Sequence, residues 1–430
     1  MRKLRIWLLL LAASLLLSGC ALKTVEELYC LPKRSESDND LQAVINEAMG
    51  KLEYCAPQSG DNQLVVQSAD LDGDGTVEYL LFAKDNSEKP LKILIFCQLA
   101  SGIVLMDTIE GYGFGFDFVS YEQVDDRPGV EIVVGRLVSE EVVRSVSVYR
   151  FSSGFSRHML SAPYSRMSVA DLNNDGICEL YLLNRSATET ECGSVITYAY
   201  NEEALKRVSE VPISTRAAAY KQMQVSLLDD GSSALYVTTE QDNNLVTDIF
   251  VHRNGALTEL ASGLISQSLR HDLVFPNDVD GDDILEMARL IPMYSQTDEK
   301  EWLLQWYSVN SNGDEAVKQH TYHNYVNNWY FEVDAAVCPY LTVERNVDAC
   351  MFSVYDPQTD SARPMITITA LRDADREDLA QKNGRIVLYS GDTVIYVADL
   401  LEAAESYGIT EENVMRRFGL IRADLKTQED

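Results

Sequence analysis

Between about residues 60 and 330, apolar residues fall in short runs that polar, turn-forming residues separate. Examples are Tyr79–Ala83, Ile132–Gly135 and Tyr181–Leu183, each of which follows an acidic turn. Short apolar runs bounded by Asp, Asn and Gly are typical of β-strands. About four such runs recur in every fifty residues or so, a spacing that favours propeller blades. The pattern therefore predicts a mainly β fold built from repeated units of about four strands.

Three of the turns share one spacing of oxygen-bearing residues. In Asp70–Glu78, carboxylates occupy positions 1, 3, 5 and 9 and a glycine occupies position 6. The pattern returns in Asp171–Glu179 and, with Asp283 in place of the glycine, in Asp278–Glu286. With the backbone carbonyl of position 7, these side chains form an all-oxygen cage of the kind that Ca²⁺ prefers. The predicted calcium ligands are Asp70, Asp72, Asp74, Thr76, Glu78, Asp171, Asn173, Asp175, Ile177, Glu179, Asp278, Asp280, Asp282, Ile284 and Glu286.

Two degenerate copies lie between the complete ones. Gln123–Glu131 keeps positions 3 and 9 but has Arg127 at position 5, and Leu227–Leu235 keeps only position 3. The five copies begin at residues 70, 123, 171, 227 and 278, so their intervals are 53, 48, 56 and 51 residues. We expect Arg127 to pair directly with Asp125 and Glu131 in place of an ion, because its cation would occupy the ion's position. The sequence thus predicts calcium in three of five repeats.

Two other interpretations of the acidic turns fit less well. An EF-hand requires a bidentate Glu at position 12 between two helices, whereas here position 12 is Leu81, Leu182 or Arg289. Asp-Gly turns form without metal, but such turns do not explain the recurring Glu at position 9. The spacing D-x-D-G-D-G-x-x-E before an apolar strand instead resembles the FG-GAP and VCBS repeats of integrin-α-like propellers and bacterial surface proteins. Over roughly residues 60–330, the resemblance implies a calcium-braced β-propeller of about five to seven blades.

The N-terminus predicts export and a lipid anchor. Three basic residues precede the apolar run Ile6–Leu17, which is too short for a spanning helix and has the form of a secretory signal. The following Leu17-Ser-Gly-Cys20 resembles the lipobox of bacterial lipoproteins. The resemblance implies cleavage before Cys20 and acylation of that residue, on the extracytoplasmic face of a membrane in a bacterial cell envelope.

Charge narrows the class of partner. The formal net charge is −31, and removal of residues 1–19 with their three basic residues leaves −34. Such a surface repels nucleic acid and anionic lipid, so we expect no nucleic acid partner. Of the seven cysteines besides Cys20, the pairs Cys338–Cys350 and Cys30–Cys55 are the most plausible disulfides outside the cytoplasm. The chain has no CxxC pair, which argues against zinc.

We expect four segments along the chain. Residues 1–19 are the signal peptide, and residues 20–58 are a tether with a short helix that Asp38 or Asp40 caps and Gly50 ends. Residues 59–325 are the repeats. Residues 326–430 form a small α+β domain, with a helix from about Arg376 to Asn383, a hairpin, and helices at about Leu400–Tyr407 and Glu411–Phe418.

Catalytic motifs are scarce. The sequence has no G-x-S-x-G, H-E-x-x-H or Walker motif, and His320 and His323 are better explained as solvated or core-edge residues than as metal ligands. Tryptophans Trp302, Trp306 and Trp329 offer sugar-stacking surfaces, although packing between blades is the simpler role. The sequence favours a non-enzymatic binding or scaffold protein for a protein or glycan ligand. The alternatives are a polysaccharide hydrolase or lyase on a propeller scaffold and an accessory subunit of an envelope assembly.

Overall fold

The computed structural model describes residues 36–139, 143–185, 191–215, 219–267, 273–295, 300–382 and 384–421. The predicted signal peptide, the acylation site Cys20 and Cys30 lie outside this part of the chain. Within it are six antiparallel sheets, so the prediction of a mainly β fold is confirmed. No helix among the described residues is long and apolar enough to cross a membrane.

The first four sheets follow one another in sequence, and their strands pair in chain order except that β1 pairs with β3 and not with β2. The first sheet contains β1 (Glu53–Tyr54), β2 (Val66–Ala69), β3 (Glu78–Lys84), β4 (Leu91–Leu99) and β5 (Gly102–Gly111). The second contains β6 (Gly115–Glu122), β7 (Glu131–Ser139), β8 (Val143–Ser152) and β9 (Phe155–Tyr164). The third contains β10 (Arg166–Ala170), β11 (Glu179–Asn184), β12 (Ser194–Asn201) and β13 (Ala204–Pro212). The fourth contains β14 (Ala219–Leu227), β15 (Ser233–Gln241), β16 (Asn244–Arg253) and β17 (Ala256–Ser266).

The last two sheets contain the remaining strands. The fifth is β18 (Met287–Pro292), β19 (Trp302–Val309), β20 (Glu315–Asn324) and β21 (Trp329–Glu332), with β27 (Phe418–Leu420) added at its edge. The sixth has the order β22 (Leu341–Arg345), β23 (Ala349–Asp356), β24 (Ser361–Leu371), β26 (Ile395–Leu400) and β25 (Arg385–Ser390). The helical elements are α3 (Glu36–Met49), η1 (Cys338–Tyr340), α4 (Arg376–Ala380), η2 (Glu405–Tyr407) and α5 (Glu411–Val414).

Successive sheets pack face to face, and the alternation of side chains along each strand explains how. On β11, Leu180 and Leu182 belong to the core shared with the second sheet. Their neighbours Tyr181 and Leu183 belong to the core shared with the fourth sheet. Because successive residues of a strand point to opposite faces, a middle sheet needs apolar residues at every position. The apolar runs in the sequence are therefore continuous and not alternating.

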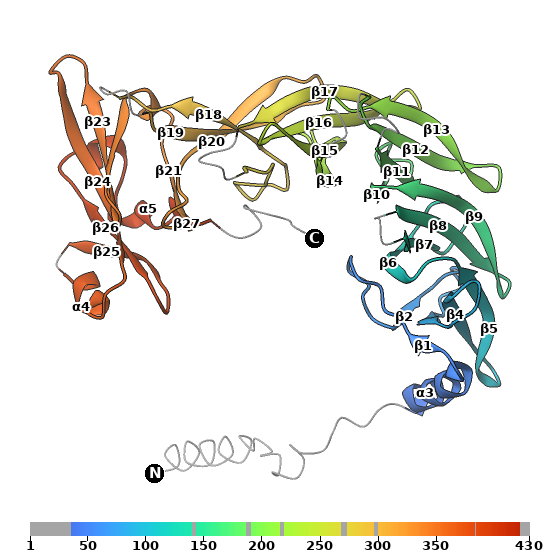
Figure 1. The fold of residues 1–430 in the computed structure, drawn as a ribbon. Coiled ribbons are helices and arrows are strands. Elements are labelled where there is room, and N and C mark those ends of the chain that lie inside the picture. Colours follow the sequence, from blue (N-terminus) through green and yellow to red (C-terminus); the bar gives the residue numbers. More distant parts are fainter. Residues whose placement is uncertain are drawn as a thin grey trace, which may run out of the picture.

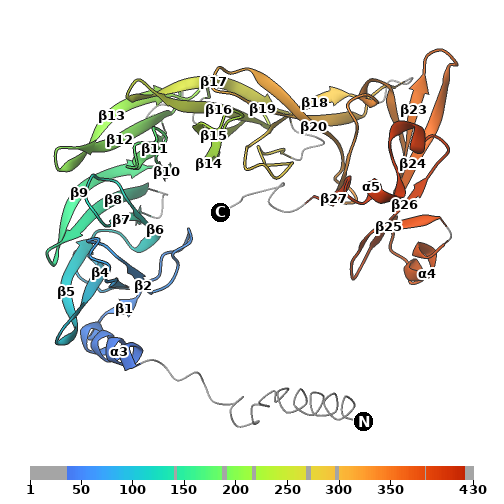
Figure 2. The same ribbon diagram turned by 180° about the vertical axis from the view of Figure 1, so that it is seen from behind.

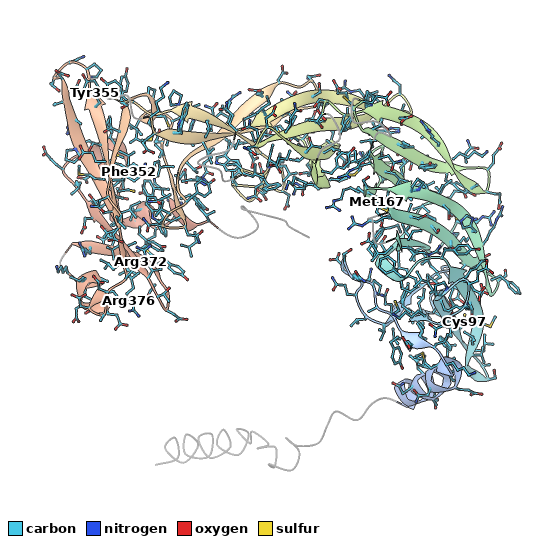
Figure 3. The ribbon with its side chains drawn as sticks, viewed as in Figure 1. Cys97, Met167, Phe352, Tyr355, Arg372 and Arg376 are labelled. Atoms are coloured by element: carbon cyan, nitrogen blue, oxygen red, sulfur yellow. The ribbon has the colours of Figure 1, made fainter. Side chains whose placement is uncertain are left out.

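The sheets follow an open arc (Figures 1 and 2), with β2, β6, β10 and β14 along its inner side and β5, β9, β13 and β17 along its outer side. Both ends of the row are covered. Helix α3 packs Ile45 against Leu81 and Phe96, on the face of the first sheet that points away from the second sheet. The sixth sheet shares one large core with the fifth, which includes Trp329 and Phe352. Side chains fill the spaces between the sheets along the whole arc (Figure 3).

The four-strand antiparallel units are consistent with propeller blades, and the helix predicted before the repeats is present. It begins at Glu36, ahead of the expected caps, and ends at Met49 before Gly50, which has a φ of +44°. The apolar stripe of α3 packs on the first sheet, as expected for an amphipathic helix at the edge of a domain.

The C-terminal region differs from the prediction in three respects. The expected boundary after residue 325 falls between β20 and β21, which are hydrogen-bonded neighbours in one sheet. The two expected helices are only the 3₁₀ turn η2 and the single turn α5, and Phe418 lies in β27 and pairs with Phe331. The left-handed Gly408, with a φ of +72°, ends η2. Cys338 and Cys350 are free and buried, so the proposed disulfide between them is absent.

Candidate metal sites

The five predicted repeat loops occupy equivalent places in five successive sheets. Three of them join the first and second strands of their sheets, the loop at Asp70–Glu78 joins β2 and β3, and the loop at Asp278–Glu286 leads directly into β18. Loops of neighbouring repeats also touch. A Cβ added to Gly129 would lie 2.4 Å from the Leu71 carbonyl oxygen, and the Cys178 amide donates a 2.7 Å hydrogen bond to the Gln123 carbonyl. The period of about fifty residues is therefore a true structural repeat.

The first acidic loop, Asp70–Glu78, folds around its own carboxylates. The Asp70 carboxylate accepts hydrogen bonds from the amides of Gly73 and Gly75, at 2.9 and 3.0 Å. Asp74 Oδ1 accepts the amide of Thr76 at 2.7 Å. Carboxylate oxygens of Asp70, Asp72 and Glu78 lie within 4.8 Å of one another. The loop therefore brings its acidic oxygens together at the distances that one cation requires.

The second acidic loop, Asp171–Glu179, repeats this turn with an amide at position 3. Asp171 accepts the amide of Gly176 at 2.8 Å, and Asp175 Oδ1 accepts that of Ile177 at 2.9 Å. Asn173 Nδ2 donates a 2.6 Å hydrogen bond to Glu179 Oε1. Its Oδ1 therefore faces the loop's amide side, where it accepts the amide of Asp175 at 2.8 Å.

The third acidic loop, Asp278–Glu286, has the same amide pattern although Asp283 replaces the glycine. Asp278 accepts the amide of Gly281 at 2.7 Å and that of Asp283 at 3.1 Å, and Asp282 Oδ1 accepts the amide of Ile284 at 2.9 Å. Asp283 adopts the left-handed conformation, with a φ of +64°. Asn and Asp tolerate this conformation better than other non-glycine residues, which explains why the substitution preserves the turn.

The glutamate at position 9 is buried in each acidic loop. Glu78 Oε2 accepts the amide of Leu71 at 2.9 Å, and Glu286 Oε2 accepts that of Val279 at 3.0 Å. Burial raises the pKa of Glu78 and Glu179, and it raises the pKa of Glu286 to about 7. Nearby loop carboxylates raise these pKa values further. Glu286 is fully buried and its Oε1 has no hydrogen-bond partner, so a cation in the loop would satisfy an otherwise costly buried atom.

These donors fit calcium in number and kind. Each loop offers several carboxylate or amide oxygens, and Ca²⁺ takes six to eight oxygen ligands in adaptable geometry. Thr76, Ile177 and Ile284 at position 7 use their amides to hold the position-5 carboxylate. Coordination through their carbonyl oxygens stays a prediction.

In the Gln123–Glu131 loop, a different arginine from the expected one takes the cation's place. Arg150, on β8, forms an ion pair with Asp125, and its Nε lies 3.5 Å from Glu131 Oε1. Arg127 instead points outward and pairs with Glu203. The prediction that Arg127 pairs with Asp125 and Glu131 is therefore wrong, because Arg150 takes that place. The turn itself resembles the acidic loops, because Val124 donates its amide to Glu131 Oε2 at 2.9 Å.

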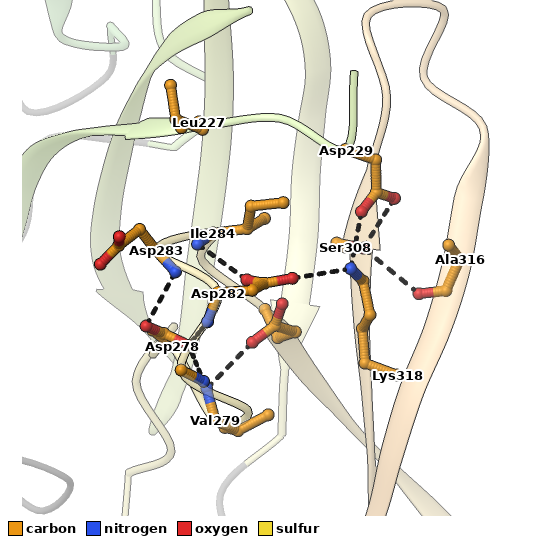
Figure 4. A network of polar contacts seen from close by, with 12 residues as sticks. Leu227, Asp229, Asp278, Val279, Asp282, Asp283, Ile284, Ser308, Ala316 and Lys318 are labelled. Atoms are coloured by element: carbon orange, nitrogen blue, oxygen red, sulfur yellow. Dashed lines mark hydrogen bonds and ion pairs between the residues drawn. The ribbon is translucent and has the colours of Figure 1, made fainter. Parts of the chain in front are cut away.

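The Leu227–Leu235 loop also has a protein cation. Lys318 Nζ, on β20, lies 2.9 Å from Asp229 Oδ1, and the Ser308 hydroxyl donates to Asp229 Oδ2 at 2.8 Å. The same ammonium lies 3.0 Å from Asp282 Oδ2 in the third acidic loop (Figure 4). One lysine thus forms ion pairs with the loops of two neighbouring sheets.

Arg150 and Lys318 are the site residues that sequence reasoning missed. Arg150 leaves a signal, because it is a charged residue between the large apolar and aromatic side chains of Val148–Phe151. Lys318 leaves none, since it stands in a strand segment of mixed polar and apolar residues, Glu315–Gln319.

A cavity of about 450 Å³ lies beside the third acidic loop. Its lining includes Asp278, Val279, Trp306, His323 and Tyr330. Trp306 and Trp329 are 2% and 1% exposed, which confirms packing as their main role. His320 and His323 are both 8% exposed and belong to the core edge, as expected.

Comparison with known proteins leaves the family open. No family model matches the chain, and no curated protein matches it. Among solved structures, a protein from Lactobacillus plantarum aligns at 10% identity with a TM-score of 0.28, covering 73% of this chain and 94% of that one. The β-propeller domain of the Trilobed protease from Pyrococcus furiosus aligns at 12% identity and 0.28, covering 71% and 90%. A rhamnogalacturonan lyase from Bacillus licheniformis aligns at 12% and 0.31, covering 85% and 77%. TM-scores of 0.28 to 0.31 do not establish a fold shared with these proteins.

Proposed function

We propose that this protein is a calcium-braced repeat scaffold of the FG-GAP/VCBS type. In this proposal, acylated Cys20 anchors it to the extracytoplasmic face of a bacterial membrane, and the row of sheets presents binding surfaces to a protein or glycan. Calcium has a structural role, and the chain is a binding module and not an enzyme.

The ion pair between Arg150 and Asp125 is the observation that carries the calcium proposal. Asp125 and Glu131 are 0% and 2% exposed, and a buried carboxylate requires a partner of opposite charge. In that loop the guanidinium of Arg150 supplies the charge. The first and second acidic loops fold in the same way, but among the described residues no Lys or Arg forms an ion pair with their carboxylates. A bound cation would supply there what Arg150 supplies in the intervening repeat.

The exported location suits this arrangement. Extracellular calcium modules bind with a Kd on the order of 0.1–1 mM. At millimolar calcium, each occupied site then contributes roughly 0.4–1.4 kcal/mol by mass action. The loops of neighbouring repeats touch at Gly129 and Gln123, so a stiffened loop also supports the next sheet.

Calorimetric titration of the calcium-stripped chain tests the proposal. We expect Asp70→Asn to remove one calcium site, because Asp70 holds two loop amides and contributes a ligand. Asp61→Asn is the matched control, because Asp61 is exposed and lies outside the loop. An unchanged number of sites in Asp70→Asn, or no calcium binding at all, would contradict the proposal.

The binding role has its own test. Intact cells are cross-linked, their membranes are isolated, and the protein is purified from the membrane fraction. The same protein or glycan partner should be recovered with it each time. Loss of the Cys20→Ser protein from the membrane fraction would support the lipid anchor. A chain that stays membrane-bound after Cys20→Ser would contradict it.

A further inference from the structure

The position-5 aspartate of the third acidic loop has a contact through its second carboxylate oxygen that sets it apart from those of the first two loops. In the first and second loops, Oδ1 of Asp74 or Asp175 accepts the amide two residues later, at 2.7 and 2.9 Å. Asp282 Oδ1 does the same in the third loop, at 2.9 Å. Its second oxygen, Oδ2, lies 3.0 Å from Lys318 Nζ. The oxygen that would turn toward a calcium ion is therefore already paired with an ammonium group.

Lys318 is held from both sides (Figure 4). Its other partner, Asp229, is fixed by the 2.8 Å hydrogen bond from the Ser308 hydroxyl. The Lys318 and Asp229 side chains are 22% and 19% exposed, and that of Asp282 is 36% exposed. The ammonium is thus partly shielded from water and lies between two carboxylates. If it moves away from Asp282, it still has Asp229 as a partner.

Lys318 does not pair with every carboxylate of the third acidic loop. Glu286 is fully buried, and its Oε1 has no hydrogen-bond partner. Lys318 pairs with Asp229 and Asp282 but not with Glu286. Carboxylate oxygens of Asp278, Asp280 and Asp282 still lie within 4.8 Å of one another. The loop therefore keeps a cation site that the lysine only partly satisfies.

We propose that Lys318 makes the third acidic loop a conditional calcium site, in which calcium and the lysine compete for Asp282 Oδ2. This inference rests on the proposed function, because it takes the acidic loops to bind calcium. Calcium entry moves Lys318 wholly onto Asp229 and completes the cage around Asp278, Asp280, Asp282 and Glu286. The first and second loops consequently fill at lower calcium concentrations than the third.

The exchange leaves the two sheets joined. The Ser226 hydroxyl donates a 3.1 Å hydrogen bond to the Asp283 carbonyl, and Leu227 and Ile284 form a parallel bridge. Neither contact involves Lys318. Calcium therefore alters the charge at the junction between the fourth and fifth sheets without separating them.

Calorimetric titration with CaCl₂ of the calcium-stripped full chain in detergent tests the competition. The background is the double variant Asp70→Asn and Asp171→Asn, which leaves the third loop as the remaining site. We expect Lys318→Met to bind calcium about tenfold more tightly, since a cation beside the ligand oxygen is removed. We expect Asp229→Asn to weaken binding severalfold, because Lys318 then has Asp282 as its one remaining carboxylate partner.

Lys221→Met is the matched control. Lys221 pairs with Glu240 at 3.0 Å and its side chain is 28% exposed, close to the 22% of Lys318, but it lies in the fourth sheet away from the loop. It should leave the third-site affinity unchanged. Equal third-site affinities in Lys318→Met and the double-variant background, or a tighter site in Asp229→Asn, would overturn the inference even where the chain with all loops intact binds calcium. Absence of calcium binding in the parent chain with all loops intact would instead overturn the proposed function. Asp229→Asn preserves the side-chain shape, so the test stands even where Lys318→Met fails to fold.

Discussion

The guanidinium of Arg150, on β8, pairs with the carboxylate of Asp125, in the loop between β6 and β7. The two residues are 4% and 0% exposed. Arg150 also lies over the ring of Tyr200 in the third sheet, with 5.6 Å from its Cζ to the ring centroid. A protein side chain thus performs in the second sheet the neutralisation that we assign to calcium in its neighbours.

Replacement of Arg150 with methionine should strongly destabilise the protein. Breaking a buried ion pair from one side leaves an uncompensated charge and typically costs about 3–5 kcal/mol. Urea unfolding in calcium-free buffer measures the loss. Arg157→Met is the control, because Arg157 pairs with Glu203 at the surface and its side chain is 56% exposed; it should leave stability nearly unchanged. Equal losses in the two variants would refute the special role of Arg150.

The close approach of the first acidic loop to the next repeat gives a second prediction. Gly129 has a φ of +102°, and an added Cβ would lie 2.4 Å from the Leu71 carbonyl oxygen. Gly231 also has a positive φ, of +79°, but its Cβ would meet no atom within 4 Å. Both alanine variants incur the backbone strain, and Gly129→Ala adds a clash with fixed backbone. We expect Gly129→Ala to be less stable than Gly231→Ala by about 1–3 kcal/mol, measured by urea unfolding. Similar stabilities would show that the loops separate easily.

The repeat could be predicted from the sequence because its information is local. A hairpin loop with oxygens at fixed spacing is recognisable within nine residues, and all five loops occupy equivalent places. The cations could not be placed in the same way. Arg150 reaches Glu131 because β7 and β8 pair with Tyr149 opposite Ile132, and Lys318 reaches Asp229 across 89 residues of chain. Such contacts depend on strand register and sheet packing, which the loop sequence does not encode.

The open arc and the C-terminal region depend on packing over still longer distances. Ile45 of α3 packs against Leu81 on β3 and Phe96 on β4, and the sequence of the helix does not specify these two partners. Phe418 has helical neighbours in sequence, yet it pairs with Phe331 and joins β27 to the fifth sheet. In both places the tertiary partner decides the outcome.

Calcium removal supplies a third prediction. At 1 mM free calcium the three acidic loops should together contribute roughly 1–4 kcal/mol, if each site has a Kd on the order of 0.1–1 mM. Scanning calorimetry with and without a chelator should therefore show a lower melting temperature without calcium. Magnesium at the same concentration is the control, since it demands tighter octahedral geometry and should restore little. A melting profile that calcium does not change would contradict the structural role.

The burial of His323 makes stability depend on pH in a defined window. His323 is 8% exposed, its Nε2 lies 3.0 Å from Thr321 Oγ1, and burial lowers its pKa to about 3. An unfolded histidine has a pKa of about 6.5, so unfolding takes up a proton between pH 6.5 and 3. The contribution of neutral His323 is thus complete above pH 6.5 and decreases as the pH falls, by about 2 kcal/mol at pH 5. Urea unfolding at pH 7.5 and 5 in calcium-free buffer should show a smaller decrease in His323→Gln than in the parent. His252→Gln, at a partly exposed position, should keep the parent's decrease, and equal decreases in all three proteins would contradict the buried neutral state of His323.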